Sequence, residues 1–170
     1  MKETIIKEIL ELVDMSLDKL YEKDEYLIQN NSTERNIVFH FSRYFSNFFD
    51  KKYAKIYDEL SVDCEYDRDD SDKKKIRDDN KNEKNIYPDF ILHKRGKNSN
   101  KNILVIEFKM YDNTDQRELQ RDIIKLKKLT DQNDNFKYKL GLHITIGKER
   151  EEVKIVKYVN GKKVENKKED

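Results

Sequence analysis

The sequence predicts a single α/β (α+β) domain in which a central mixed β-sheet is flanked by helices. Three observations carry this prediction. The chain has 170 residues, which suits one domain. Its apolar residues are few and are concentrated in about seven short segments, enough for one modest core. The periodicity of these segments gives the order helix, helix, three strands, helix, two strands, which is typical of a layered α/β arrangement.

The first two segments have helical periodicity. Apolar residues recur three and four positions apart near the N-terminus, so we expect an amphipathic helix over about residues 4–21. A second helix should begin near Glu34, because Ser32 or Thr33 can cap it and an apolar stripe rich in phenylalanine follows. Glu34 would then lie in the first turn, close to the apolar edge of the helix.

The remaining segments alternate as strands do, or repeat as a helix does. Strands are expected over residues 60–66, 87–94, 102–110, 138–147 and 153–159. The second and third of these should form a hairpin, because a glycine-containing turn joins them. Leucine and isoleucine at helical spacing predict a further helix over about residues 115–130.

Two charged segments stand outside this pattern. Residues 67–85 contain one apolar residue and mixed charge, which predicts a mobile loop that tolerates shortening. The Lys- and Glu-rich tail, residues 161–170, is expected to fray, so the domain itself is assigned to residues 1–160.

Composition excludes several function classes. Lys and Arg number 36 against 35 Asp and Glu, so the formal net charge is only +1. This is not the strongly basic balance of a protein that coats nucleic acid, although a local basic groove is compatible with it. The single cysteine, Cys64, excludes an internal disulfide and a thiolate zinc site. No segment resembles a signal peptide or a membrane span, so we expect a cytoplasmic protein with no membrane partner.

Three charged residues interrupt the segments that should be buried: Asp89, Glu107 and Lys109. Glu107 and Lys109 are two positions apart and therefore point to the same face of their strand, and Asp89 comes from the preceding hairpin strand. An unpaired ionised side chain inside a sheet costs several kcal/mol, so these groups must pair, meet water in a cleft or bind something. The simplest alternative is a structural Glu107–Lys109 pair, with Asp89 capping a turn.

Chemistry favours a metal site over that pair. Two carboxylates that lie close together repel unless a cation sits between them. Oxygen ligands from one or two carboxylates, completed by water and phosphate, are what Mg²⁺ prefers. A lysine beside such an ion can orient or deprotonate a water molecule and can neutralise charge on a phosphate.

The sequence "PDF", with "IEFK" at the end of the next strand, resembles the PD-(D/E)XK nuclease superfamily. The phrases "TERNIVFHFSRYF", "VDCEYDR", "PDFILHKRG" and "NILVIEFK" extend the resemblance over about residues 30–147. It implies a restriction-endonuclease-like three-layer core. It also implies that Asp89 and Glu107 hold Mg²⁺ or Mn²⁺, with the Phe108 carbonyl as a third oxygen, and that Lys109 positions the attacking water. Glu34, on the first core helix, would also face the metal, or would only favour the helix dipole.

The implied function is a metal-dependent nuclease that hydrolyses phosphodiester bonds of DNA, and less readily of RNA, in bacterial defence or DNA processing. Four further residues are candidates for substrate binding: Glu65, Arg68, His93 and Arg95. His93 lies on the strand face of Asp89, and Arg95 lies in a turn that can touch a phosphate backbone.

Two other function classes remain open. One is a catalytically inactive protein of this fold that binds nucleic acid. The other is a protein-interaction module, which would need a protein partner or a homodimer. Asp122 and Lys125, on the third helix, could line the cleft or simply pair on the helix surface, and we expect the surface pairing.

Overall fold

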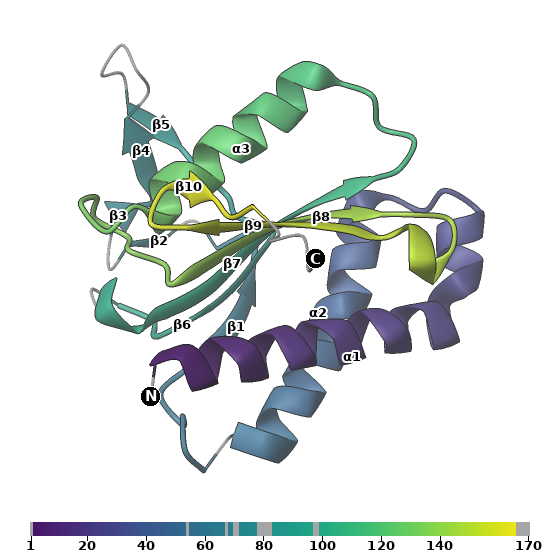
Figure 1. The fold of residues 1–170 in the computed structure, drawn as a ribbon, viewed down its shortest axis with the longest axis horizontal. Coiled ribbons are helices and arrows are strands. Elements are labelled where there is room, and N and C mark those ends of the chain that lie inside the picture. Colours follow the sequence, from purple (N-terminus) through teal and green to yellow (C-terminus); the bar gives the residue numbers. More distant parts are fainter. Residues whose placement is uncertain are drawn as a thin grey trace.

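A six-stranded mixed sheet lies at the centre of the computed structural model, with helices on both faces (Figure 1). The structure describes residues 2–53, 55–66, 68–69, 72–77, 83–96 and 99–165. Neighbouring strands are antiparallel except for one central parallel pair, β7 and β8. In order across the sheet, the strands are β1 (Ser61–Cys64), β6 (Phe90–His93), β7 (Asn102–Met110), β8 (Leu140–Ile146), β9 (Lys154–Val159) and β10 (Lys162–Lys163).

The helices lie in two layers. α1 (Lys2–Gln29) and α2 (Glu34–Tyr53) pack together against one face, and α3 (Gln116–Thr130) covers the other (Figure 1). α3 is the crossover that allows β7 and β8 to run parallel, as a parallel pair requires. Two short 3₁₀ helices, η1 (Ser99–Lys101) and η2 (Arg150–Glu152), lie in connections. The predicted element order and the mixed sheet between helices are confirmed.

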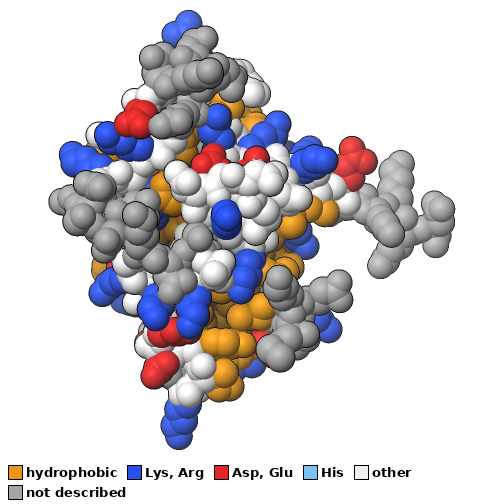
Figure 2. Space-filling view, turned by 90° about the vertical axis from the view of Figure 1, so that its left-hand side faces the viewer, with side chains coloured by type: hydrophobic (Ala, Val, Ile, Leu, Met, Phe, Trp, Pro, Cys, Tyr) orange, Lys and Arg blue, Asp and Glu red, His pale blue; other side chains and the backbone are white. Residues whose placement is uncertain are grey.

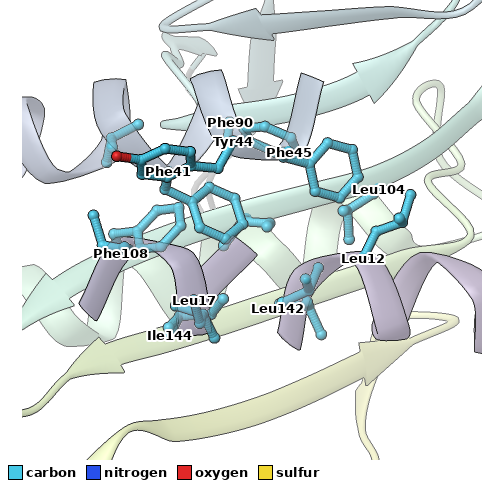
Figure 3. Packing of buried hydrophobic residues seen from close by; sticks show 14 of the residues in the cluster. Leu12, Leu17, Phe41, Tyr44, Phe45, Phe90, Leu104, Phe108, Leu142 and Ile144 are labelled. Atoms are coloured by element: carbon cyan, nitrogen blue, oxygen red, sulfur yellow. The ribbon is translucent and has the colours of Figure 1, made fainter. Parts of the chain in front are cut away.

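Aromatic residues of α2 hold the first helical layer against the sheet. Phe41 lies edge-on to Phe90 and Phe108, with ring centroids 5.4 and 5.0 Å apart, and Phe45 lies edge-on to Phe90 at 5.0 Å. Figure 3 shows these rings between the helices and the strands. Edge-to-face pairs of this kind stabilise a core beyond the area that they bury. α2 begins where the sequence predicts, and Thr33 Oγ1 accepts a hydrogen bond from the Asn36 backbone nitrogen at 3.3 Å.

α1 is longer than the periodicity predicts. It runs to Gln29 and contains a kink at Asp24, where φ and ψ leave the helical region. The Asp24 carboxylate accepts a hydrogen bond from the Tyr44 hydroxyl at 2.6 Å, which ties the kinked part of α1 to α2. A long-range contact therefore extends the helix beyond the segment that its apolar periodicity marks.

α3 approaches the sheet closely at one point. Gly141 in β8 faces the last turn of the helix, and a Cβ placed there would lie 2.8 Å from Thr130 Cγ2 and 3.3 Å from Leu126 Cδ2. Real side chains do not come this close, so the missing side chain sets the distance between α3 and β8.

The segment 67–85 differs from its prediction. Its described residues form two short antiparallel ladders, β2 (Arg68–Asp69) with β3 (Asp72–Lys73) and β4 (Lys75–Arg77) with β5 (Glu83–Asn85). Residues 67, 70–71 and 78–82 lie outside the described residues. The described parts of the predicted charged loop therefore contain short antiparallel ladders.

Lys74, between β3 and β4, anchors this segment to the body of the protein. It is 3% exposed, and its Nζ lies 3.1 Å from the Tyr138 hydroxyl. The same ammonium lies 5.2, 5.6 and 5.5 Å from the ring centroids of Tyr66, Phe136 and Tyr138. A cation enclosed by aromatic faces is stabilised by the charge distribution of the rings, so a residue that composition marks as solvated becomes part of the core.

Charged side chains of both signs lie on the face of the molecule drawn in Figure 2. Within the described ranges, no helix has both the length and the apolar character needed to cross a membrane. On the face drawn in Figure 2, Lys and Arg side chains are spread widely among other side chains. Of the predicted charged tail, residues 162–163 form β10, and residues 166–170 lie outside the described residues.

Candidate active site

The charged residues of β7 lie at the centre of the molecule, on the side covered by α3. Every residue of β7 is buried, and Glu107 is only 1% exposed. Leu104, Ile106 and Phe108 belong to the core beneath α1 and α2, whereas Val105 belongs to the core beneath α3. Glu107 and Lys109 share the face of Val105, as strand alternation predicts.

Asp89 is held at the end of the β6–β7 ladder. It lies immediately before β6, and its Oδ2 accepts a hydrogen bond from the Phe108 backbone nitrogen at 2.7 Å. By the same register Pro88 lies opposite Phe108, so the Asp89 side chain binds a β7 N–H just before the first residue of β6. Burial raises the pKa of Asp89 above its usual value, although the Phe108 hydrogen bond opposes the shift.

Glu107 has two oxygens in different surroundings. Oε2 accepts from Lys125 Nζ at 2.5 Å, whereas the buried Oε1 has no hydrogen-bond partner in the described part of the chain. Burial raises the pKa of Glu107 well above its usual value, and the negative charge of Asp89 raises it further. One step beyond the Phe90–Ile106 pair of the β6–β7 ladder, Asp89 lies opposite Glu107 on the neighbouring strand.

Lys109 lies among three carboxylates. Its Nζ is 3.3 Å from Glu118 Oε2, 3.4 Å from Asp122 Oδ2 and 3.6 Å from Glu34 Oε2. Burial alone would lower the pKa of Lys109, but the surrounding carboxylates outweigh it and raise the pKa. The simple alternative, a Glu107–Lys109 pair, is wrong: each residue pairs with a different group on a helix.

Glu34 reaches this site from the first turn of α2. Burial raises its pKa to about 7, with the charges of Asp89, Asp122 and Glu118 adding to the shift and Lys109 opposing it. The structure thus places Glu34 beside Lys109, as its position at the start of the helix predicts, and gives it a pKa near neutrality.

Three site residues on α3 were not predicted. The expectation that Asp122 and Lys125 pair on the outer surface is wrong, because both are mostly buried and contact Lys109 and Glu107. Glu118 is the third. Positions 118, 122 and 125 recur at helical spacing beside the apolar stripe that faces the sheet, and this pattern is a signal that could have identified them.

His143 is a fourth residue that sequence reasoning left out. It pairs in register with Glu107 across the parallel β7–β8 ladder, so both side chains point toward α3. It is buried, and no described residue forms a hydrogen bond with its Nε2. Burial lowers the pKa of His143, which favours a neutral ring. A histidine in the middle of the apolar strand "LGLHITI" was the available signal.

The candidates for substrate binding are divided between two places. His93 Nε2 lies 3.0 Å from Asp63 Oδ2, and Arg95 binds both oxygens of the same carboxylate at 2.9 and 2.5 Å. Burial would raise the pKa of Asp63, but these two partners lower it to about 2. His93 is four residues along β6 from Asp89, about 13 Å at strand spacing. The structure therefore ties His93 and Arg95 to Asp63 and does not bring them to the site.

The other two candidates have different outcomes. Glu65 Oε1 lies 2.7 Å from Arg35 Nε at the outside of the molecule, and both residues line a cleft next to the site. The backbone of Arg68 belongs to β2, but its side chain lies outside what the structure describes.

The cleft has a volume of about 550 Å³ and runs from the site along α2. Glu34 and Asp89 line it together with Arg35, Val38 and Phe39 of α2. Thr33, before α2, and Cys64 and Glu65, at the end of β1, complete its lining. The site is thus reached through a cleft of the size that small-molecule sites have.

The residues at the site fit a hard cation. No group of three His, Cys, Asp or Glu side chains in the described ranges is arranged to hold a metal ion. Mg²⁺, however, is commonly bound by one or two carboxylates with water and substrate oxygens, and Asp89 and Glu107 provide two. The unpartnered Oε1 of Glu107 is a buried acceptor that a cation would satisfy.

The balance of charge at the site also favours a cation. Its carboxyl groups are Glu34, Asp89, Glu107, Glu118 and Asp122, and its ammonium groups are Lys109 and Lys125. Five carboxylates against two ammonium groups leave three excess negative charges when all are ionised. Burial and mutual repulsion therefore raise the pKa of Glu34, Asp89 and Glu107.

Comparison with known proteins adds no assignment. No protein-family model, curated protein or solved structure gives a match to this chain. The resemblance to the nuclease superfamily therefore rests on the sequence motifs alone, and the geometry of the site is the further guide to function.

Proposed function

We propose that this protein is a metal-dependent nuclease that hydrolyses phosphodiester bonds of nucleic acid, with DNA as the favoured substrate and RNA as the less favoured one. The observation that carries the proposal is the pair of buried carboxyl groups, Asp89 and Glu107. Repulsion between them raises the pKa of Glu107, one oxygen of Glu107 has no partner in the described part of the chain, and a lysine lies two residues further on. A cation between the two carboxyl groups would offset their repulsion and would provide a partner for the free oxygen of Glu107.

The topology supports the finer fold assignment, a restriction-endonuclease-like core. Helix α2 is followed by the antiparallel strands β1, β6 and β7, then by α3 and by β8 parallel to β7. The motif resemblance implies a core with this order of elements. Asp89 lies just before β6, and Glu107 and Lys109 lie on β7, which supports the proposal.

Asp89, Glu107 and the Phe108 carbonyl would hold Mg²⁺ or Mn²⁺. In an extended strand, the N–H and C=O of one residue point to the same side. The Phe108 carbonyl therefore faces the same strand edge as the Phe108 N–H, which donates to Asp89 just before β6 begins. When bound, such an ion polarises a phosphoryl oxygen and lowers the pKa of a coordinated water molecule.

Lys109 and Glu34 would have different roles, the first in stabilising charge and the second in accepting a proton. The raised pKa keeps the Lys109 ammonium charged at neutral pH, so it can orient a water molecule and stabilise negative charge on the phosphate but is a poor proton acceptor. Glu34, with a pKa of about 7, is matched to accept a proton near neutrality, and its Oε2 lies 3.6 Å from Lys109 Nζ.

The test is cleavage of single-stranded, duplex and branched DNA and of RNA by the pure protein. We expect EDTA to abolish cleavage, and Mg²⁺ or Mn²⁺ to restore it, whereas Ca²⁺ should not. Asp89→Asn should lower cleavage by orders of magnitude, and Mn²⁺ should raise the melting temperature of the parent protein but not that of Asp89→Asn. Glu83→Gln, an exposed carboxyl change in β5, is the matched control and should affect neither. Cleavage that survives chelation would contradict the proposal.

One observation favours a second candidate, an inactive protein of the same fold that only binds nucleic acid or a protein partner. Lys125 Nζ already neutralises Glu107 at 2.5 Å, as a resident cation would. Binding of DNA without cleavage in any divalent metal, together with a melting temperature that Mn²⁺ does not change, would favour this candidate over the nuclease.

A further inference from the structure

An exposed phenylalanine, Phe39, lines the cleft beside the site. Phe39 lies on α2, one turn after Glu34 and Arg35, and is 59% exposed. It differs from Phe41 and Phe45, which point from the same helix into the core. Phe39 contacts the edge of the His40 ring at a centroid distance of 5.4 Å. An exposed ring of this size next to polar site residues is available to a ligand.

The lining of the cleft combines two kinds of chemistry. Glu34 and Asp89 belong to the site and contribute carboxyl groups, whereas Val38, Phe39 and Cys64 provide apolar surface. Arg35 and Glu65 form an ion pair at the rim, with an Nε–Oε1 distance of 2.7 Å. A ligand that fits this lining has an anionic group that a metal can bind and, beside it, a flat apolar group. A nucleotide combines both.

We propose that this cleft binds an unpaired nucleobase next to the phosphodiester that is cleaved, with the base stacked on Phe39. This inference rests on the proposed nuclease function and narrows its substrate class to single strands, flaps or frayed ends. A paired base inside a duplex has both faces covered by its neighbours, so it cannot offer a face to Phe39 without leaving the stack. Stacking on aromatic side chains is the usual way in which proteins hold single strands without reading their sequence.

The absence of tryptophan from the chain gives a direct probe. Phe39→Trp introduces the only indole, and its fluorescence can be followed on titration with a single-stranded thymidine dodecamer in Ca²⁺, which should not support cleavage. We expect quenching by the single strand and much less by an equal length of duplex. Ile56→Trp is the matched control, because Ile56 is 66% exposed and lies beyond the far end of α2. Its indole should not respond.

Cleavage provides the second measurement. Phe39→Ala should lower the activity on the single strand about tenfold, within the range of stacking contributions, whereas Phe39→Tyr should retain it. Quenching that is equal for duplex and single strand, or absent, would overturn the cleft assignment even if Mn²⁺-dependent cleavage is intact. Quenching by the single strand without cleavage in any metal would instead support the cleft and remove the nuclease function. The two proposals therefore fail separately.

Discussion

The two oxygens of Glu107 differ in their partners: Oε2 accepts a hydrogen bond from Lys125, whereas Oε1 has no partner in the described part of the chain. Lys125 compensates the charge of a carboxyl group that is 1% exposed, and Lys125 itself is mostly buried. Burial would lower the pKa of Lys125, but Glu107 and Asp122 outweigh it and raise the pKa. Each partner therefore favours the ionised form of the other, although burial of Glu107 opposes its ionisation.

Removal of Lys125 should destabilise the metal-free protein strongly. Lys125→Met leaves a buried carboxylate unpaired, which costs about 3–5 kcal/mol. Since 1 kcal/mol corresponds to about 2–4 °C in a chain of this size, thermal melts should show a drop of roughly 6 °C or more. Mn²⁺ should recover more stability in Lys125→Met than in the parent protein, because the ion replaces the missing charge.

The matched variants should have smaller effects. Glu107→Gln removes the repulsion with Asp89 but also the main partner of Lys125, which keeps Asp122 Oδ1 at 3.6 Å, so the melting temperature should fall less than in Lys125→Met, while cleavage falls by orders of magnitude. Lys127→Met, on the exposed side of α3, should change little. If Glu107→Gln melts far below the parent and Mn²⁺ shifts neither protein, the carboxyl pair is structural and the metal site is lost as an explanation.

Among the elements, the connection between β1 and β6 shows how packing can override composition. A segment of mixed charge would be expected to contribute nothing to the fold, and its shortening would then be harmless. The structure instead anchors it through Lys74, which lies against the rings of Tyr66, Phe136 and Tyr138. Together with Ile76, which packs against the core beneath α3, this side chain holds the short strands to the body of the protein.

Lys74→Ala should lower the stability measurably, whereas Lys75→Ala should not. Lys74 loses a buried cation–π cluster and the hydrogen bond to the Tyr138 hydroxyl, which together should be worth about 2 kcal/mol or more. Lys75 forms only an exposed pair with Glu83 at 3.1 Å, and such pairs contribute little. Urea unfolding followed by circular dichroism would measure both, and equal midpoints for the two variants would show that the cluster does not stabilise the fold.

For the whole molecule, the carboxyl groups of the site predict how stability depends on pH. Glu34, Asp89 and Glu107 all have a pKa above the usual value, mainly because of burial. The folded state therefore holds more protons than the unfolded state between the ordinary pKa of about 4.5 and the Glu34 pKa of about 7. The free energy of unfolding of the metal-free protein should fall as pH rises through this window.

Thermal melts in EDTA at pH 5.5 and pH 8 test this directly. The melting temperature should be a few degrees lower at pH 8, and Glu34→Gln should reduce the difference, because it removes one of the titrating groups. Mn²⁺ should also reduce it, since a bound cation favours the ionised carboxylates. A higher melting temperature at pH 8 than at pH 5.5 in EDTA would show that these groups do not raise one another's pKa.

How much the sequence could predict follows from the range of each interaction. β7 has the predicted bounds, because every residue of Asn102–Met110 is buried and the apolar run marks it. The shared strand face of Glu107 and Lys109, and the place of Asp89 beside the neighbouring strand, followed from strand alternation and hairpin pairing, which are local. The pairing partners Glu118, Asp122 and Lys125 did not, because they depend on how α3 crosses the sheet. The anchoring of Lys74 depends on residues more than sixty positions away, which periodicity does not report.

The missing side chain at Gly141 gives the site a mechanical dependence on a distant residue. The last turn of α3 rests on β8 at this point, with no room for a methyl group beside Thr130 Cγ2. The first two turns of the same helix carry Glu118 and Asp122 to Lys109. The position of α3 over the sheet therefore depends on the missing side chain at Gly141. We expect Gly141→Ala to displace the last turn of α3 and, through the helix, the carboxylates that meet Lys109, so chemistry at the site would respond to a residue outside the lining of the cleft.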